Sequence, residues 1–412
     1  MRAYRRTTCR LCGSGDIELA IPLTPTPVAD DFVPVSRRDE PQETFPLDVF
    51  LCRACGLVQL VDVVDASSIY VEYLYVTKSS PGLTDHFRAY ADGVARRLAL
   101  APGSSVVEIG SNDGTLLSFF KALGMRVLGV DPAREIARAA TQGGVETRPL
   151  CFTSDVAREL HRECGAADLI VANNVIANID DLDDFGEGIR QLLSPGGTFV
   201  FESGYLADLV QNLVFDNIYH EHVSYHSVKP LACFFSRHGM ELFDVEHVET
   251  KGGSIRGYVQ LSGAARPVVP AVAAMIAGEE AQELYEPETY RGLCRRLDRL
   301  RNALVDVLAG LRRRGRAIAG YGASHSVTTL VHHFGVGELL SFIVDDNPRK
   351  HHLYSPGHHL HVLPSAALLE RRPDYVVILP WRFAAAIVAR NQAFLANAGR
   401  FVVPIPDLRI IQ

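Results

Sequence analysis

Short apolar runs alternate with longer segments of helical periodicity from residue 105 onward. The runs at 105–109 and 126–130 predict buried strands, with a helix at 114–123 between them. The other expected elements of this series are helices at 85–98 and 133–140 and strands at 169–172, 197–202 and 242–247. Strands that alternate with helices at this spacing indicate a doubly wound, mostly parallel sheet.

A leucine stripe separates this series from a second one. Leucines recur at three- and four-residue steps across 290–314, which predicts one amphipathic helix packed between two domains. Four more strands are expected after it, at 317–321, 340–344, 375–379 and 400–404. We therefore expect two Rossmann-like, doubly wound α/β domains preceded by a small domain, with boundaries at 1–70, 71–285 and 286–412.

Composition and charge narrow the class of protein. Of the 412 residues 47% are hydrophobic and 22% are charged, as in globular proteins of two or three domains. The formal net charge of -7 argues against general binding to nucleic acid, whose phosphates would repel it. The sequence has no run of about 18 apolar residues, so we expect no membrane span. The basic segment 1–13 has no apolar core behind it, so we expect no signal peptide and a cytoplasmic location.

Two Cys-x-x-Cys pairs, each followed by glycine, lie near the N-terminus. Cys9 and Cys12 form one pair, and Cys52 and Cys55 form the other. In a reducing compartment such pairs favour metal binding over disulfides, and four thiolates complete the tetrahedral shell that zinc prefers. Redox-active pairs are the alternative. Because four ligands leave no position for an activated water molecule, we expect the zinc to be structural.

The loop after the strand at 105–109 has the pattern of a cofactor-binding turn. Its sequence is Glu108-Ile109-Gly110-Ser111-Asn112-Asp113-Gly114, and Gly110 lets the backbone approach a ligand closely. The next strand ends in Asp131, where an acid can accept hydrogen bonds from both hydroxyls of a ribose. The glycine spacing differs from the G-x-G-x-x-G of dinucleotide-binding proteins. The loop resembles motif I of class I methyltransferases, and the segment 172–179 resembles the fourth-strand motif of the same fold.

A polar stretch at 215–225 brings together two histidines, an acid and two tyrosines. Its centre, Tyr219-His220-Glu221-His222, lacks the H-E-x-x-H spacing of zinc proteases, which argues against a catalytic metal. Histidine titrates near neutrality, and a nearby carboxylate can orient its ring. The stretch therefore predicts acid–base chemistry, with a stabilising cluster of surface histidines as the alternative.

The order of these motifs along the chain is similar to that of the sugar C-methyltransferases. The two cysteine pairs and the cofactor loop are accompanied by Tyr73-Leu74-Tyr75, Tyr219-His220-Glu221-His222, Gly252-Gly253-Ser254-Ile255-Arg256 and Gly320-Tyr321-Gly322-Ala323. The resemblance is to the nucleotide-sugar 3-C-methyltransferases of deoxysugar antibiotic pathways, and it covers nearly the whole chain. It implies an N-terminal zinc domain, a central domain that binds S-adenosylmethionine and a C-terminal Rossmann-like domain, with the sugar nucleotide between the last two.

The resemblance also implies a reaction and roles for individual residues. Methyl transfer from S-adenosylmethionine to C3 of a nucleotide-linked 4-keto deoxysugar needs a base to remove the C3 proton and a donor to stabilise the enolate. His222 is the expected base, assisted by Glu221, Tyr219 and Tyr75. The expected cofactor contacts are Glu108, Gly110, Asn112, Asp131, Asn173 and Asn174. The expected substrate contacts are Lys251, Tyr321, Ser324, His325 and Asp345.

Three departures from the family pattern bear on which molecule accepts the methyl group. The family usually has histidine where this chain has Asn178, often histidine where Lys251 stands, and commonly a lysine-bearing loop in place of Ser324-His325-Ser326-Val327. Asn178 cannot act as a base, and loss of the loop lysine changes how a diphosphate would be held. Two alternatives stay open, namely methylation of an oxygen, a nitrogen or a non-sugar carbon, and a non-catalytic scaffold that keeps the cofactor fold. The expected partner is a small-molecule substrate rather than nucleic acid or a membrane, and a monomer is compatible with the sequence.

Overall fold

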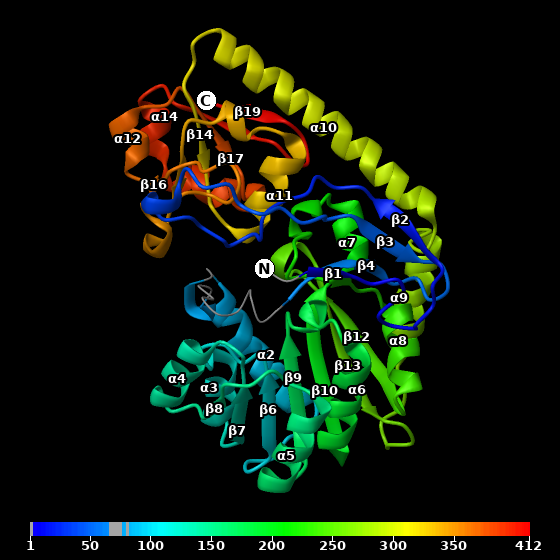
Figure 1. The fold of residues 1–412 in the computed structure, drawn as a ribbon. Coiled ribbons are helices and arrows are strands. Elements are labelled where there is room, and N and C mark those ends of the chain that lie inside the picture. Colours follow the sequence, from blue (N-terminus) through cyan, green and yellow to red (C-terminus); the bar gives the residue numbers. More distant parts are fainter. Residues whose placement is uncertain (1–2, 66–75, 80–81) are drawn as a thin grey trace.

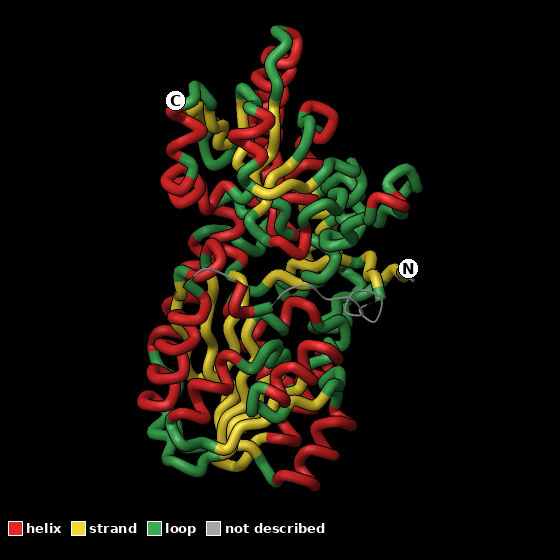
Figure 2. The backbone as a smooth tube through the Cα atoms, turned by 90° about the vertical axis from the view of Figure 1, so that its left-hand side faces the viewer, coloured by secondary structure: helices red, strands yellow, loops and turns green. Residues whose placement is uncertain are grey.

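The computed structural model describes residues 3–65, 76–79 and 82–412 and contains two α/β units with strands of the N-terminal segment between them. In Figure 1 the first unit, cyan to green, lies below, and the second, yellow to red, lies above. The view from the side shows the two sheets following one another along the long axis of the molecule (Figure 2). The predicted fold class, two doubly wound α/β domains preceded by a small cysteine-bearing domain, is confirmed.

The first unit is built on a sheet of seven strands, counted over the described residues, in the order β12-β13-β10-β9-β6-β7-β8. The strands from β10 to β8 run parallel to one another, and β13 is antiparallel to both of its neighbours. The strands are β6 (Ser105–Ile109), β7 (Arg126–Val130), β8 (Thr147–Arg148), β9 (Ala167–Asn173), β10 (Leu193–Gly204), β12 (Met240–Val248) and β13 (Ser254–Leu261). The two strands predicted at 105–109 and 126–130 are confirmed to the residue.

Helices cover both faces of this sheet because successive strand residues point to opposite sides. Val106 belongs to a hydrophobic cluster with α2 and α3, whereas Val107 belongs to a cluster with α5, α6 and α8. The helices of this unit are α2 (Leu83–Arg97), α3 (Thr115–Ala122), α4 (Arg134–Gln142), α5 (Ser154–Cys164), α6 (Leu182–Leu192), α7 (Leu206–Gln211), α8 (Val228–Arg237) and α9 (Pro270–Ala281). The cofactor loop therefore leaves β6 at the carboxyl edge of the sheet, between two packed faces.

The N-terminal strands form a small antiparallel sheet that includes a strand from much later in the chain. Its order is β11-β4-β3-β2, where β11 (Ser224–Tyr225) directly follows the predicted catalytic residues. Its other strands are β2 (Ile17–Ile21), β3 (Val49–Cys52) and β4 (Val58–Leu60), and a separate pair joins β1 (Ala3–Arg5) to β5 (Asp62–Val64). The cysteine-bearing segment and the polar stretch at 215–225 thus share one sheet.

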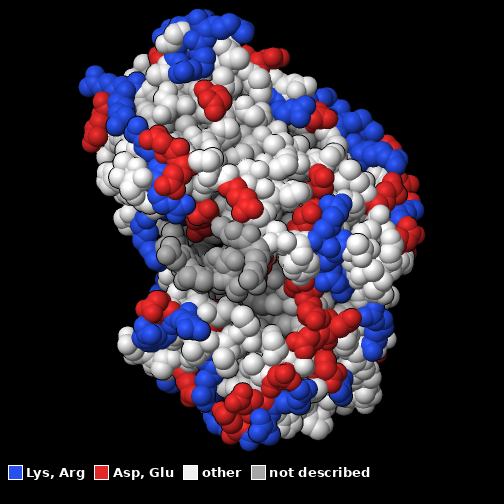
Figure 3. All heavy atoms as spheres, viewed as in Figure 1, with Lys and Arg blue, Asp and Glu red and all other residues white. Residues whose placement is uncertain are grey.

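A long helix connects the two α/β units. Helix α10 (Pro287–Arg313) confirms the helix predicted at 290–314, and it runs along the outside from the first unit to the second (Figure 1). Five leucines of the predicted stripe are buried, at positions 293, 297, 304, 308 and 311, while Leu300 is partly buried. Basic side chains gather along the side of the molecule where this helix runs (Figure 3). Arg291, Arg295 and Arg299 of the helix are exposed.

The second unit is a six-stranded sheet within the described chain, in the order β16-β15-β14-β17-β18-β19. All neighbours are parallel except β18 and β19. Its elements are β14 (Ile318–Tyr321), α11 (His325–Phe334), β15 (Ile343–Asp345), β16 (Val362–Pro364), α12 (Ala367–Arg371), β17 (Tyr375–Ile378), α13 (Ala384–Arg390), α14 (Gln392–Ala396), β18 (Arg400–Val403) and β19 (Arg409–Ile411). In residues 3–65, 76–79 and 82–412 no helix has both the length and the apolar character needed to cross a lipid bilayer.

Candidate active site

A cavity of about 390 Å³ lies at the carboxyl ends of the strands of the first sheet. Open α/β sheets bind their ligands at this edge. The cavity brings together residues from at least six separate places in the sequence. Its lining includes Glu108, Gly110, Asn112, Asp131, Asn173, Asn174, Tyr219, Glu221, His222, Lys251 and His325. The predicted cofactor residues therefore share one cavity with three of the four predicted catalytic residues.

The conformation of the cofactor turn is restrained by close packing and by backbone hydrogen bonds. Gly110 has φ +70°, and a Cβ on this residue would collide with Val175. The N–H of Gly110 donates to the Val130 carbonyl at 2.7 Å, which ties the turn to β7. At the end of β7, Asp131 accepts the N–H of Asn112 at 2.8 Å and the N–H of Ala133 at 2.9 Å. Each Asp131 oxygen keeps lone pairs for a further donor, as a ribose would supply.

Glu108 adds a buried acceptor to the floor of this cavity. The residue is 3% exposed, and its Oε2 has no hydrogen-bond partner among the described residues. Burial raises the pKa of Glu108 well above its usual value, and the charges of Asp131 and Asp113 add to this effect. A buried acceptor without a partner is costly unless a ligand supplies a donor. The glycine turn, the acid at the end of β7 and this acceptor together fit a nucleoside ligand with a cationic, donor-bearing tail.

Two neighbours fix the ring of His222 at the cavity wall. Its Nδ1–H donates to the backbone carbonyl of Asn217 at 3.0 Å, which leaves Nε2 as the acceptor of the neutral ring. The Tyr219 hydroxyl lies 3.0 Å from Nε2 and donates to it. Desolvation by the surrounding protein lowers the pKa of His222 to about 4. His222 is therefore neutral near pH 7 and presents an unprotonated Nε2 beside a phenol.

Glu221 lines the same cavity but makes no hydrogen bond to either of these side chains. It is 5% exposed, and neither of its carboxylate oxygens has a hydrogen-bond partner in the described part of the chain. Burial raises the pKa of Glu221 to about 7, with Asp30 adding to the shift and Lys350 opposing it. Those two residues form an ion pair of 2.8 Å that joins the N-terminal segment to the second α/β unit. The contacts that orient His222 thus come from Asn217 and Tyr219, while Glu221 is affected by the charges of Asp30 and Lys350.

The five predicted substrate residues fall into two groups. Lys251 and His325 line the cavity, and the His325 ring lies 5.7 Å from the ring of Tyr219. The other three, Tyr321, Ser324 and Asp345, lie outside its lining. Tyr321 donates to Asp346 at 2.9 Å, Ser324 approaches Ser326 at 3.1 Å, and Asp345 accepts the N–H of Ala323 at 2.6 Å. The fourth predicted catalytic residue, Tyr75, lies outside the described residues.

Some residues of this region were not predicted from the sequence. The carbonyl of Asn217 orients the His222 ring, and Asp180 lines the cavity as the acceptor of several basic side chains. Glu202, 1% exposed, binds His86 at 2.9 Å and Arg256 at 2.9 Å. Asp180 could have been found, because it follows the fourth-strand motif by one residue. The partners of Glu202 lie on α2 and β13, and no sequence motif links them.

The four predicted metal ligands converge. The sulfur atoms of Cys9, Cys12, Cys52 and Cys55 all lie within 4.8 Å of one another, with Cys9–Cys55 and Cys12–Cys52 each 3.6 Å apart. Four thiolates at these separations fit the tetrahedral coordination of Zn²⁺. With all four positions supplied by cysteine, the site suits a structural ion.

Three stretches of the chain match models of known protein families. Residues 9–70 match a model described as "Putative zinc binding domain", and residues 83–245 match "Methyltransferase domain". Residues 249–406 match "C-methyltransferase C-terminal domain". The first stretch contains the four cysteines, and the second contains the cofactor loop and His222.

The chain is 36% identical to the C-methyltransferase NovU of Streptomyces niveus over 404 residues, which are 98% of this chain and 96% of that protein. Among solved structures, an S-adenosylmethionine-dependent methyltransferase from Clostridium acetobutylicum is 14% identical, with TM-score 0.35, over 44% of this chain and 92% of that one. The PH0226 protein from Pyrococcus horikoshii is 15% identical, with TM-score 0.37, over 46% of this chain and 95% of that one. The similarity to NovU extends across the cysteine cluster, the cavity and the second α/β unit.

Proposed function

Because this chain belongs to the C-methyltransferase family and is an S-adenosylmethionine-dependent enzyme with a structural zinc site, we propose that it methylates C3 of a nucleotide-linked 4-keto deoxysugar. The observation that carries this proposal is that one cavity is lined both by the cofactor loop and by the neutral His222. Carbon methylation needs a base of this kind beside the methyl donor, because an unactivated carbon is no nucleophile. Such a product belongs to deoxysugar biosynthesis for an antibiotic.

His222 and Tyr219 share the proton chemistry in this proposal. The Nε2 atom of His222 accepts the proton from the carbon beside the ketone, since its Nδ1 hydrogen is committed to Asn217. Tyr219 then turns its hydroxyl from Nε2 to the keto oxygen and stabilises the enolate that forms. S-adenosylmethionine, when bound, supplies an electrophilic methyl group. The enolate carbon would take up this methyl by in-line displacement, with the electron pair of the broken sulfur–methyl bond left on the sulfur of the demethylated cofactor. Tyr75 is proposed to assist Tyr219.

The remaining roles are proposed for residues of the cavity lining and for three residues outside it. We assign cofactor binding to Glu108, Gly110, Asn112, Asp131, Asn173 and Asn174. Lys251 and His325 are assigned to the sugar, at the side of the cavity nearest Tyr219. Tyr321, Ser324 and Asp345 are assigned to the nucleotide end of the substrate. Glu221 is assigned to the place where the sugar and the nucleotide meet. The proposed domains are 1–70, 71–285 and 286–412, with the acceptor between the last two.

The test is methyl transfer from labelled S-adenosylmethionine to a 4-keto sugar nucleotide. We expect the wild type to exchange the C3 proton with solvent deuterium and to place the label on C3, as resolved by NMR. In His222→Asn we expect exchange and transfer to fall by about 10²–10⁴-fold, with cofactor affinity within about twofold of wild type. The exposed His161→Asn is the matched control and should keep full activity.

Three results would contradict the proposal at different points. Full activity of His222→Asn would remove the assigned base. A label on C5, which the same ketone acidifies, would move the reaction to another carbon. Transfer to oxygen or nitrogen without carbon exchange would exclude the enolate.

A further inference from the structure

The segment that carries His222 is held by the small N-terminal sheet. Val223, the next residue, donates its N–H to the Ala177 carbonyl at 2.7 Å and accepts the N–H of Leu60 at 2.9 Å. The following residues form β11, which pairs with β4 in the register Ser224↔Gln59. The backbone on the C-terminal side of His222 therefore depends on strands that begin beside the zinc ligands.

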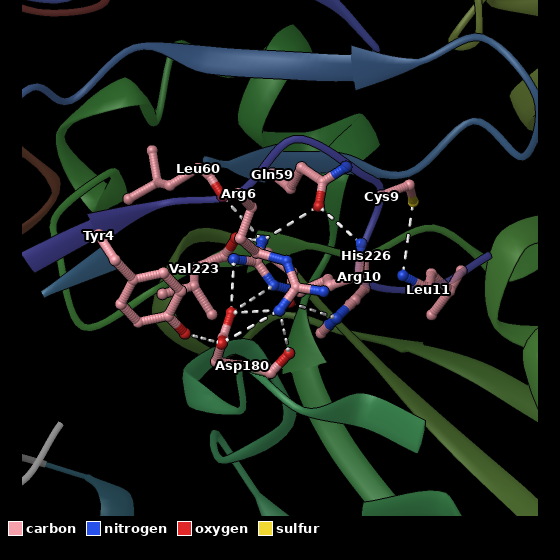
Figure 4. A network of polar contacts seen from close by, with 11 residues as sticks. Tyr4, Arg6, Cys9, Arg10, Leu11, Gln59, Leu60, Asp180, Val223 and His226 are labelled. Atoms are coloured by element: carbon pink, nitrogen blue, oxygen red, sulfur yellow. Dashed lines mark hydrogen bonds and ion pairs between the residues drawn. The ribbon is translucent and has the colours of Figure 1, made fainter. Parts of the chain in front are cut away.

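Arg10, which lies between the ligands Cys9 and Cys12, reaches this same point (Figure 4). Its side chain is fully buried. Its Nη1 donates to the carbonyl of Leu60 at 2.9 Å and also to the carbonyl of Val223. One guanidinium nitrogen thus joins β4 to the residue after His222.

The other side of the guanidinium binds Asp180, which lines the cavity. Nη2 of Arg10 lies 3.0 Å from Asp180 Oδ1, and Arg6 and Tyr4 also donate to this carboxylate (Figure 4). Although burial alone would raise the pKa of Asp180, the bonds and charges of Tyr4, Arg10 and Arg6 lower it. Asp180 is therefore an anion whose position is set by basic side chains of the zinc-binding segment.

The arrangement requires arginine. The planar guanidinium presents several donors in a fixed fork, so one side chain can bind two carbonyls and a carboxylate at the same time. An ammonium group at this position is a single point charge and cannot reach all three acceptors in that geometry. Arg6 shares only the contact with Asp180, and among the described residues its side chain does not bond to Val223 or Leu60.

We propose that Arg10 is a positioning residue. It fixes Asp180 and the segment 215–226, which carries His222, to the small N-terminal sheet, so that Nε2 of His222 faces the methyl acceptor. The proposal rests on the proposed role of His222 as base. The proposal gives the zinc site a part in catalysis without placing metal in the cavity, because the two Cys-x-x-Cys pairs hold the backbone from which Arg10 extends. Displacement of a reacting group by ~1 Å costs about 10²-fold in rate, so a loosened segment is expected to lower turnover sharply.

The experiment compares Arg10→Lys and Arg10→Met with Arg6→Met as the matched control. We expect kcat to fall about tenfold in Arg10→Lys and about 100-fold in Arg10→Met, and less than about twofold in Arg6→Met. All three variants should keep one zinc per chain and S-adenosylmethionine affinity within about twofold of wild type. Amide hydrogen exchange of the segment 215–226 should be faster in both Arg10 variants and unchanged in Arg6→Met.

The exchange measurement needs no acceptor substrate, so it separates this inference from the proposed function. If no 4-keto sugar nucleotide is methylated but the segment loosens in the Arg10 variants, the proposed substrate fails and the positioning contact stands. If kcat falls while exchange of 215–226 is unchanged, Arg10 acts by another route and the proposal is overturned. Loss of zinc or of cofactor binding in Arg10→Lys would assign Arg10 to general stability, which also overturns it.

Discussion

His226 is a buried residue whose titration should weaken the fold in acid. Desolvation by burial lowers its pKa to about 3, and the ring lies between the hydroxyls of Ser203 at 2.9 Å and Ser224 at 3.0 Å. Because the folded pKa is below the unfolded value of about 6.5, the unfolded chain binds the proton more tightly between these limits. The stability that the fold gains from neutral His226 is therefore present above pH 6.5 and is lost as the pH falls toward 3. The pKa of Glu221 is raised to about 7, so its effect on stability changes with pH in the opposite direction.

The corresponding variant is His226→Gln, which keeps polar atoms but cannot titrate. We expect the stability advantage of the wild type over this variant to shrink by about 2 kcal/mol between pH 7 and pH 5, since one pH unit is worth ~1.4 kcal/mol per proton. Urea unfolding of both proteins across that range measures the difference. Parallel curves for the two proteins would show that His226 takes up no proton on unfolding.

Gly110 should tolerate no side chain. Alanine there would adopt φ +70°, at about 1–2 kcal/mol, and its Cβ would collide with Val175. We expect Gly110→Ala to weaken S-adenosylmethionine binding at least tenfold by calorimetry. The double variant Gly110→Ala/Val175→Ala removes the collision but not the backbone strain, so it should recover part of the loss. Gly196→Ala is the control, because a Cβ there meets nothing within 4 Å; equal losses in both single variants would contradict the argument.

At the scale of elements, local patterning explains which strands were predicted. Strand β6 is an apolar run between Gly103 and Gly110, and strand β7 is an apolar run between Gly124 and Pro132. The bounds of both strands agree with the prediction. The strand β13 was not predicted, because the segment around Gly252-Gly253 stood out as a motif rather than as an apolar run. The two-residue strand β11 exists only through its pairing with β4, far away in the sequence. Pairing of that kind leaves no periodicity to detect.

The short helix η8 (Trp381–Phe383) of the second unit should support the segment that carries His222, the proposed base. Arg382 binds the buried Asp216 at 2.6 Å and the side chain of Asn217 at 3.2 Å, and the Asn217 carbonyl orients His222. Arg382→Met leaves the Asp216 carboxylate buried and unpaired, which costs about 3–5 kcal/mol. We expect a lower melting temperature together with a kcat reduced about tenfold.

A double variant separates these two effects. Asp216→Asn/Arg382→Met removes both charges, so stability should largely return while kcat stays low, because Asn217 still lacks its support. Arg390→Met is the control, since its ion pair with Asp346 is exposed at the surface and is worth about 0–1 kcal/mol. Full recovery of kcat in the double variant would show that Arg382 serves stability alone.

At the scale of the whole molecule, the sequence predicted the parts of the site better than the contacts between them. Tyr219 and His222 are three residues apart, so their hydrogen bond depends on local chain geometry. Arg10 meets Asp180 and Val223 across 170 and 213 positions, and those contacts depend on how the N-terminal segment packs against the first α/β unit. Such packing is decided by tertiary context, which one sequence does not display as a pattern.

Loss of zinc should therefore reach the cavity while sparing the cofactor loop. Cys12→Ser removes one of four ligands, and metal affinity in such sites is folding free energy for the segment that binds it. The cofactor turn belongs to β6 and β7, which share no strand with the zinc-binding sheet, whereas the His222 segment continues into that sheet as β11. We expect Cys12→Ser to contain less than one zinc per chain, to melt at a lower temperature and to lose at least about tenfold in kcat, yet to bind S-adenosylmethionine within severalfold of wild type.

Cys164→Ser, which changes an exposed cysteine, should match the wild type in all four measurements. A zinc-depleted protein with undiminished kcat would show that the N-terminal sheet holds the His222 segment without its metal, and equal losses of kcat and cofactor affinity would show that the two sides of the cavity unfold together.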